Sequence, residues 1–240
     1  GVDIPNPNHF ADVASSGGGI SILSTQLLSN SDFSTGAFAA EYGNALAGVF
    51  DLNLRKGNNE KREYTVQAGF LGLDVAAEGP FSKNYRGSYL INYRYSTLSV
   101  LSNLGLNVGD AVTNFQDLSY NIYLPTKKLG NFSLFGFGGL SDQNQNAKKD
   151  STLWEEDYQR YDYTYFSNTG VTGLKHTITL NLNTFLQTTL LFSGHNYGDQ
   201  EDRLDNNYDP QFYYKSAYTT KRITLASVIN NKLNAKNNLR

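Results

Sequence analysis

From about Arg62 to the end of the chain, apolar and polar residues alternate with a period of two. A period of two is typical of β-strands with two different faces, whereas an amphipathic helix repeats every 3.6 residues. We therefore predict that most of the chain is antiparallel β-structure. In the segment 131–140, both parities carry apolar residues. The clearest alternation occurs in the segments 64–70, 87–96, 117–124, 186–193 and 222–229.

The connections between these strands alternate in length. Short turns fit residues 81–84, 125–130 and 181–183, and long polar segments fit residues 97–114, 142–159 and 195–213. Strands of about ten residues, with short turns at one end and long loops at the other, are typical of outer-membrane β-barrels. The 17 Tyr and 14 Phe residues are numerous enough for two aromatic girdles. On pattern alone, the alternative is a large soluble β-sandwich or extracellular β-domain.

Composition excludes several classes of function. The 20 Lys and Arg residues are balanced by 22 Asp and Glu residues, so no net field favours nucleic acid. The chain has no cysteine, which excludes disulfides, thiolate zinc sites and cysteine nucleophiles. No apolar run approaches the roughly 18 residues of a transmembrane helix. No nucleophile motif or phosphate-binding loop is present, so we expect neither an enzyme nor a cofactor.

Residues 1–60 have a different character. Pro5 and Pro7 precede the run SSGGG at residues 15–19, and the apolar segments 20–23 and 49–54 follow. Glycine-rich turns between short apolar segments predict a compact αβ or β unit. The turn at Gly57, Asn58 and Asn59 predicts a boundary between residues 1–60 and residues 61–240.

The stretch FSTGAFAAEYGNALAGVFDLNLRKG, from Phe33 to Gly57, resembles the end of the plug domain of TonB-dependent outer-membrane receptors. In that family a glycine, small residues, a Tyr-Gly pair and a Gly-Val pair precede the last plug strand, and a basic turn leads into the barrel. The chain departs from the family at residues 35–37 and 54–56, and the resemblance covers about residues 1–95. The residues that carry the plug–barrel signature are Tyr42, Gly43, Asn44, Ala45, Gly48, Val49 and Arg55.

The small residues of this signature have a physical role in the prediction. A plug backbone inside a barrel must approach the wall closely, and a glycine or alanine permits that approach. We therefore expect Gly43, Ala45, Ala47 and Gly48 to lie against the barrel wall. The alternative is a generic glycine-rich strand entry.

The resemblance implies a fold and a function. It implies the C-terminal part of an αβ plug domain, followed by about eight of the 22 antiparallel strands of a transmembrane β-barrel. It also implies a Gram-negative outer-membrane receptor that actively transports a scarce nutrient: a metal chelate, a vitamin, a glycan or a peptide. The implied partners are outer-membrane lipid, the nutrient, TonB with ExbB and ExbD, and in some branches a surface lipoprotein. The TonB box would lie on the N-terminal side of Gly1.

Candidate ligand sites are few. His9, His176 and His195 lack the spacing of a zinc site, so we expect them to be satisfied or exposed. The acidic stretch from Asp199 to Asp209 could bind calcium, but it lacks the order of a calcium loop and fits a solvated external loop better.

Aromatic and amide side chains supply the other candidates. Trp154 and Tyr158 could stack on a sugar or a peptide, although an aromatic girdle that ends in a polar loop explains them as well. Side chains expected on the polar face could hold the plug by hydrogen bonds or fill a wet interior. These are Asn92, Arg94, Asn121 and Asn168.

Two other classes of protein stay open. One is a complete eight-stranded barrel that serves as an anchor or adhesin, with residues 1–60 as an independent extension. The other is a soluble carbohydrate-binding β-domain that uses Trp154. An outer-membrane hydrolase would need a nucleophile and a base that the sequence does not display.

Overall fold

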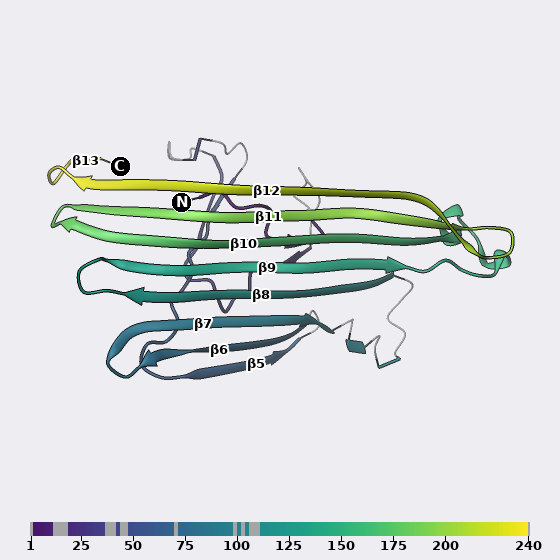
Figure 1. Ribbon diagram of the computed structural model, residues 1–240, viewed down its shortest axis with the longest axis horizontal. Coiled ribbons are helices and arrows are strands. Elements are labelled where there is room, and N and C mark those ends of the chain that lie inside the picture. The colour runs from purple at the N-terminus through teal and green to yellow at the C-terminus, as the bar shows by residue number, and fades with distance from the viewer. Residues whose placement is uncertain are drawn as a thin grey trace.

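The computed structural model describes residues 2–11, 19–36, 42–43, 48–69, 72–97, 100–101, 104–105 and 111–239. One antiparallel sheet of nine strands dominates the described residues, and each strand pairs with its neighbours in sequence (Figure 1). The prediction of an all-β, antiparallel chain is confirmed. The strands are β5 (Glu63–Ala68), β6 (Gly72–Ser82), β7 (Tyr85–Ser96), β8 (Ala111–Pro125), β9 (Asn131–Gln145), β10 (Tyr161–Asn181), β11 (Thr184–Leu204), β12 (Pro210–Lys232) and β13 (Asn238–Leu239).

The three short turns occur where the sequence predicts them. Residues 83–84 connect β6 to β7, residues 126–130 connect β8 to β9, and residues 182–183 connect β10 to β11. Gly130 has a φ of 78°, and a Cβ there would overlap the backbone oxygen of Thr177. The turn before β9 therefore requires glycine.

The prediction of a long loop at residues 195–213 is wrong. β11 continues to Leu204 and β12 begins at Pro210, so only residues 205–209 connect them. The polar side chains of this stretch belong to strands that remain paired, with one bulge between Glu201 and Asp202. The segment 142–159 also begins inside a strand, because β9 ends at Gln145. Two 3₁₀ turns follow, η1 (Ser151–Leu153) and η2 (Asp157–Arg160).

The nine-stranded sheet is not closed. In the described residues, β5 forms one edge, and β12 pairs on its outer side only with the two residues of β13. The eight strands β5 to β12 match the number expected, but no barrel closes within them. A long uncovered edge strand normally requires a further pairing partner.

The N-terminal segment, residues 2–60 as far as they are described, crosses one face of the sheet (Figure 1). The short strand β1 (Asn8–His9) pairs with β2 (Ile20–Ser21), and β3 (Asp32–Ser34) pairs with β4 (Val49–Asp51). The described residues of this segment contain no helix. The α component of the expected αβ unit therefore has no counterpart there.

The sheet has two different faces. We call the face that contacts the N-terminal segment the covered face, and the opposite one the bare face. The hydrophobic core lies between the N-terminal segment and the covered face, where Ile22 and Leu23 meet Phe137, Val171 and Leu191. This contact explains why both parities of the segment 131–140 are apolar. Phe137 faces the core, while the apolar residues of the other parity lie on the bare face.

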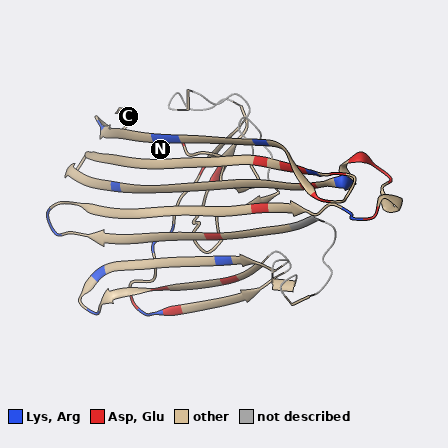
Figure 2. Cartoon of the chain, turned by 45° about the vertical axis from the view of Figure 1, so that its right-hand side comes forward, with Lys and Arg blue, Asp and Glu red and all other residues tan. Residues whose placement is uncertain are grey.

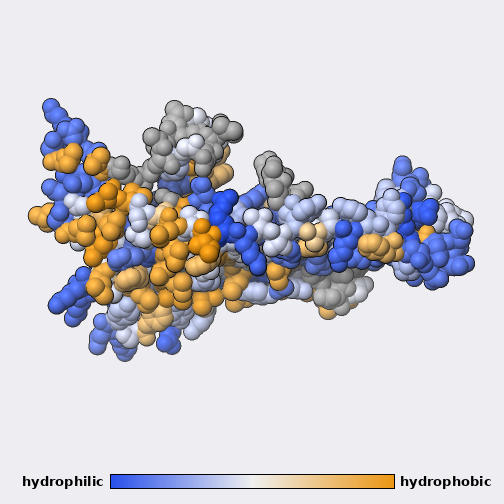
Figure 3. All heavy atoms as spheres, turned by 45° about the horizontal axis from the view of Figure 1, so that its top comes forward, coloured by the Kyte–Doolittle hydropathy of each residue, from blue (hydrophilic) through white to orange (hydrophobic). Residues whose placement is uncertain are grey.

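The bare face exposes a band of large apolar side chains (Figure 3). Val66 is 77% exposed, and Ile223 and Leu225 are each 71% exposed. The strand register places apolar residues side by side across five strands, in the row Ile122, Leu134, Leu174, Leu190 and Leu225. Among the described residues, no helix is long and apolar enough to cross a membrane.

Candidate functional site

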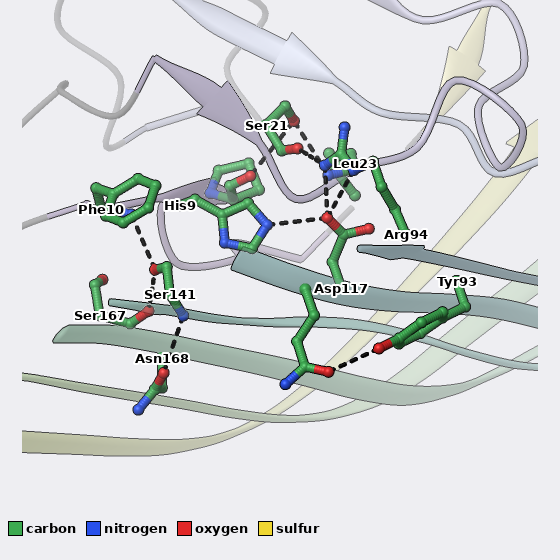
Figure 4. A network of polar contacts seen from close by, with 12 residues as sticks. His9, Phe10, Ser21, Leu23, Tyr93, Arg94, Asp117, Ser141, Ser167 and Asn168 are labelled. Atoms are coloured by element: carbon green, nitrogen blue, oxygen red, sulfur yellow. Dashed lines mark hydrogen bonds and ion pairs between the residues drawn. The ribbon is translucent and has the colours of Figure 1, made fainter. Parts of the chain in front are cut away.

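The interface between the N-terminal segment and the covered face carries the most concentrated polar chemistry in the described part of the chain (Figure 4). Its side chains come from four neighbouring strands, β7 to β10. Strand alternation places residues 92, 94, 117, 119 and 121 on one face, because successive residues point to opposite sides. The N-terminal segment supplies the remaining partners.

His9, Asp117 and Arg94 form the centre of this interface. The Nε2 atom of His9 lies 2.9 Å from Oδ2 of Asp117, and both side chains are fully buried. Arg94 donates to the same oxygen from Nε at 2.9 Å and from Nη2 at 2.6 Å, and also donates to the backbone oxygen of Ser21. One buried carboxylate therefore joins β1 of the N-terminal segment to two strands of the sheet. A buried charge requires such pairing.

Arg55 and Glu78 form a second attachment. Nη1 and Nη2 of Arg55 donate to the two carboxylate oxygens of Glu78 at 2.9 and 2.7 Å. The backbone N–H of Asn58 donates to the same carboxylate at 2.6 Å. This two-point geometry fixes the guanidinium in orientation as well as in position. The segment that leads into β5 is thus anchored to β6.

The backbone beside Arg55 also touches the sheet. Asn121 donates from Nδ2 to the backbone oxygen of Arg55 at 2.9 Å. Two residues on, a Cβ at Gly57 would overlap the backbone oxygen of Tyr89. The chain therefore passes directly over β7 at Gly57, where only glycine fits.

Serine side chains hold the end of β1. Ser141 accepts the backbone N–H of Phe10 at 3.2 Å and donates to the backbone oxygen of Ser167 at 2.5 Å. Ser167 donates to the backbone oxygen of Ala11 at 2.7 Å, and its hydroxyl lies 3.2 Å from Nε2 of His195. These contacts satisfy backbone groups that the N-terminal segment cannot pair internally.

The four side chains predicted to hold the N-terminal segment behave differently. Arg94 and Asn121 do bind it. Asn92 is buried on the covered face but donates to Asp74 of the neighbouring strand at 2.5 Å. The prediction for Asn168 is wrong: it pairs in register with Leu140 on the bare face, because the serine at position 167 takes the inward position.

The signature residues lie elsewhere than expected. Tyr42 donates to Asp51 at 3.2 Å, and Val49 pairs with Ser34 in the β3–β4 hairpin. A Cβ at Gly43 would meet open space, and one at Gly48 would meet the ring of Phe33 at 3.0 Å. The expectation that Gly43 and Gly48 lie against the sheet is therefore wrong, because Gly57 makes that approach instead. Asn44, Ala45 and Ala47 lie outside the described residues.

The far end of the sheet carries a second cluster, where acidic side chains gather (Figure 2). Trp154 donates to the backbone oxygen of Lys148 at 2.7 Å, and its ring meets Tyr208 edge-on at 6.1 Å. The hydroxyl of Tyr208 donates to Ser151 at 3.0 Å. The connections on either side of β10 and β11 are thereby joined. Tyr158 is exposed. The aromatic residue beside Trp154 is instead Tyr208, which the sequence pattern did not indicate.

Local hydrogen bonds order this cluster. The hydroxyl and backbone N–H of Thr152 both donate to the carboxylate of Asp150, which caps η1. The hydroxyl bond in particular holds the pKa of Asp150 below its usual value.

The described residues contain no group of three or more His, Cys, Asp or Glu side chains placed to hold a metal ion. The acidic stretch is dispersed: Asp199 accepts from Ser216, Glu201 pairs with Arg203 at 2.7 Å, and Asp205 caps a turn. The calcium interpretation therefore has no geometric support there. His176 is hydrogen-bonded to the backbone oxygen of Leu129, at 2.6 Å.

Two cavities flank the interface. One of about 400 Å³ is lined by Lys56, Arg86 and Asn131, with the ammonium of Lys56 3.9 Å above the ring of Tyr123. The other, of about 600 Å³, is lined by residues that include Thr25 and Arg94. Both lie beside the N-terminal segment.

The sequence pattern did not reveal the contacts Asp117–His9 and Glu78–Arg55, because their partners are 108 and 23 residues apart. The only sequence signal for these contacts was an acidic residue at a polar position of an alternating strand. Comparison with protein-family models, with curated proteins and with solved structures gave no match for this chain.

Proposed function

We propose that this chain is part of a TonB-dependent outer-membrane transporter, with residues 1–60 as the C-terminal part of the plug and residues 61–240 as the N-terminal portion of the barrel. One observation carries the proposal. The N-terminal segment is bound to one face of an antiparallel meander through the buried contact of His9 with Asp117 and the ion pair of Arg55 with Glu78, and the opposite face is apolar and exposed. A soluble sheet would bury that apolar face instead.

The apolar band approaches the height of a membrane. On the bare face of β11, the apolar side chains run from Leu186 to Phe192, and Asn196 and Gln200 follow. This stretch spans seven residues, somewhat fewer than the 9–11 with which a tilted strand crosses a bilayer. β10 and β11 have 21 residues each and β12 has 23, so about ten residues of each extend beyond the band. These extensions correspond to the external side of a barrel.

The interface of the proposed plug combines a small apolar core with ion pairs and hydrogen bonds, and these polar contacts suit a part that is held and then released. Ion pairs and hydrogen bonds can be exchanged for contacts with water, whereas an apolar core of the same area resists wetting. In the proposed mechanism, the plug occludes the lumen, the nutrient binds on the external side, and TonB pulls on the plug to open a path. The receptor itself breaks no bond.

The first test asks whether the bare face contacts lipid. Residues 1–240 contain no cysteine, so Ile223→Cys is the only thiol among them, and any cysteine elsewhere in the full-length protein is first replaced by serine. We expect Ile223→Cys to resist a hydrophilic maleimide in native membranes and to react after denaturation. Asn207→Cys, in the exposed β11–β12 turn, is the control that reacts in both states. Full labelling of Ile223→Cys in membranes would contradict the proposal and favour a soluble domain.

The second test concerns the plug. Deletion of residues 42–49 from the full-length receptor should let a large hydrophilic antibiotic enter cells, and the leak should persist in a strain without TonB. The control is an equal amount of each receptor in the outer membrane. Unchanged antibiotic sensitivity would count against the assignment of residues 1–60 as a plug.

A further inference from the structure

Beyond the N-terminal segment, the covered face of β10, β11 and β12 is lined by tyrosines. The hydroxyl of Tyr165 donates to the backbone oxygen of Ala11 at 3.2 Å, so this lining begins beside Ala11. Tyr163 pairs in register with Glu201, which pairs with Tyr214. Tyr197 pairs with Tyr218, and their rings stack at 5.2 Å. The tyrosine wall, as we name it, consists of Tyr161, Tyr163, Tyr165, Tyr197, Tyr214 and Tyr218.

The other side chains of this surface are polar. On the same face, the strand register places Asp199, Glu201, Arg203 and Ser216 among the tyrosines, and no aliphatic residue falls between them. Arg203 is the single cation in this set. It is engaged by Glu201 at 2.7 Å and lies over the ring of Tyr161, 4.4 Å from its centroid. Tyr214 is 45% exposed and Tyr218 is 55% exposed, so their rings are open to a ligand.

This chemistry discriminates between classes of ligand. An anionic metal chelate would require cations that are available to pair with it, and the one guanidinium here is already paired. A peptide would be held by apolar pockets or by strand pairing at a sheet edge. The wall has no apolar pocket, and in the proposed barrel the edge of β12 pairs with the next strand. A neutral sugar has C–H faces that lie flat on aromatic rings and hydroxyl edges that donate to carboxylates. The wall presents both aromatic rings and carboxylates.

We propose that the tyrosine wall binds a neutral glycan. The inference rests on the proposed function, because in a barrel the covered face beyond the plug lines the external entrance to the lumen. It goes further by assigning the class of cargo and the residues that contact it. The rings of Tyr214 and Tyr218 stack on sugar units. The second carboxylate oxygens of Asp199 and Glu201, beside those that contact Ser216 and Arg203, accept hydrogen bonds from the sugar hydroxyls.

The experiment uses the full-length receptor in detergent and an array of neutral oligosaccharides that includes glucans, xylans and mannans. We expect at least one of these glycans to be retained, and its affinity to be measured by calorimetry. Tyr214→Ala and Tyr218→Ala should each weaken binding about tenfold, which is the scale of one aromatic contact. Tyr214→Phe should retain most of the affinity, because stacking persists without the hydroxyl.

Phe212→Ala is the matched control. Phe212 is 70% exposed on the same strand but lies across the bulge, paired with Asp202 on the bare face. Its replacement should leave glycan affinity unchanged. Retention of no neutral glycan, retention only of a ferric catecholate complex or of peptides, or equal effects of Phe212→Ala and Tyr214→Ala would each overturn the proposal.

The labelling of Ile223→Cys separates this inference from the proposed function. A shielded cysteine in a receptor that retains no glycan overturns the glycan assignment alone. A fully labelled cysteine in a protein that binds glycan through Tyr214 and Tyr218 overturns the membrane assignment, while the tyrosine wall stands as a glycan site.

Discussion

Asp117→Ala tests whether the buried ion pair holds the N-terminal segment against the sheet. The substitution leaves His9 and Arg94 without the oxygen that both contact. Loss of one partner of a buried pair costs about 3–5 kcal/mol. The side chain of Arg94 is 15% exposed and keeps its bond to Ser21, so the lower end of that range applies. A loss of about 3 kcal/mol weakens docking of the segment roughly a hundredfold.

Hydrogen exchange measures this change directly. The backbone N–H of Phe10 is held by Ser141 of β9, so it exchanges only when the segment leaves the sheet, whereas that of Ile22 is held by Pro7 within the segment. We expect the amide of Phe10 to exchange about a hundred times faster in Asp117→Ala. Asp117→Asn, which keeps an acceptor for His9, should have an intermediate effect.

Asp142→Ala is the control for this measurement. Asp142 is a carboxylate on the neighbouring strand β9 that accepts from Asn114 and Asn144 and does not face the N-terminal segment. Unchanged exchange at Phe10 in Asp117→Ala would refute the reasoning. Equal acceleration in Asp142→Ala would refute it as well, since the effect would then be a general loss of stability.

Two further substitutions test individual contacts. Gly57→Ala should destabilise docking by about 1–3 kcal/mol, because its Cβ overlaps the backbone oxygen of Tyr89, whereas Gly43→Ala should change stability by less than about 0.5 kcal/mol. Thermal unfolding of both variants checks this, and equal effects would contradict the close approach at Gly57. Tyr208→Gly, which suits the φ of 62° at that position, should shift the emission of Trp154 to longer wavelength, because the edge-on ring contact is lost. Trp154 is the only tryptophan, so its fluorescence is specific, and an unshifted spectrum would show that the two connections do not pack together.

Much of the fold could be predicted because strand periodicity is a local property. Alternation alone located β5, β7 and β8, and the apolar parity of segments such as 186–193 correctly predicted the bare face. The turn before β9 could also be predicted, because the backbone geometry at Gly130 requires glycine. The ends of β11 and β12 could not be predicted, because the polar residues 195–204 and 210–213 alternate too weakly to distinguish a solvated strand from a loop.

The sequence by itself determined that this chain forms antiparallel strands with one apolar face, since side chains alternate across a strand regardless of its neighbours. Only the tertiary structure decided what the polar face contacts. His9 meets Asp117, Gly57 crosses β7, and Ser167 rather than Asn168 faces the N-terminal segment. These pairings depend on the register of β7 to β10 and on the path of a segment far away in sequence. A single residue of register moves every side chain to the opposite face, so no local pattern specifies them.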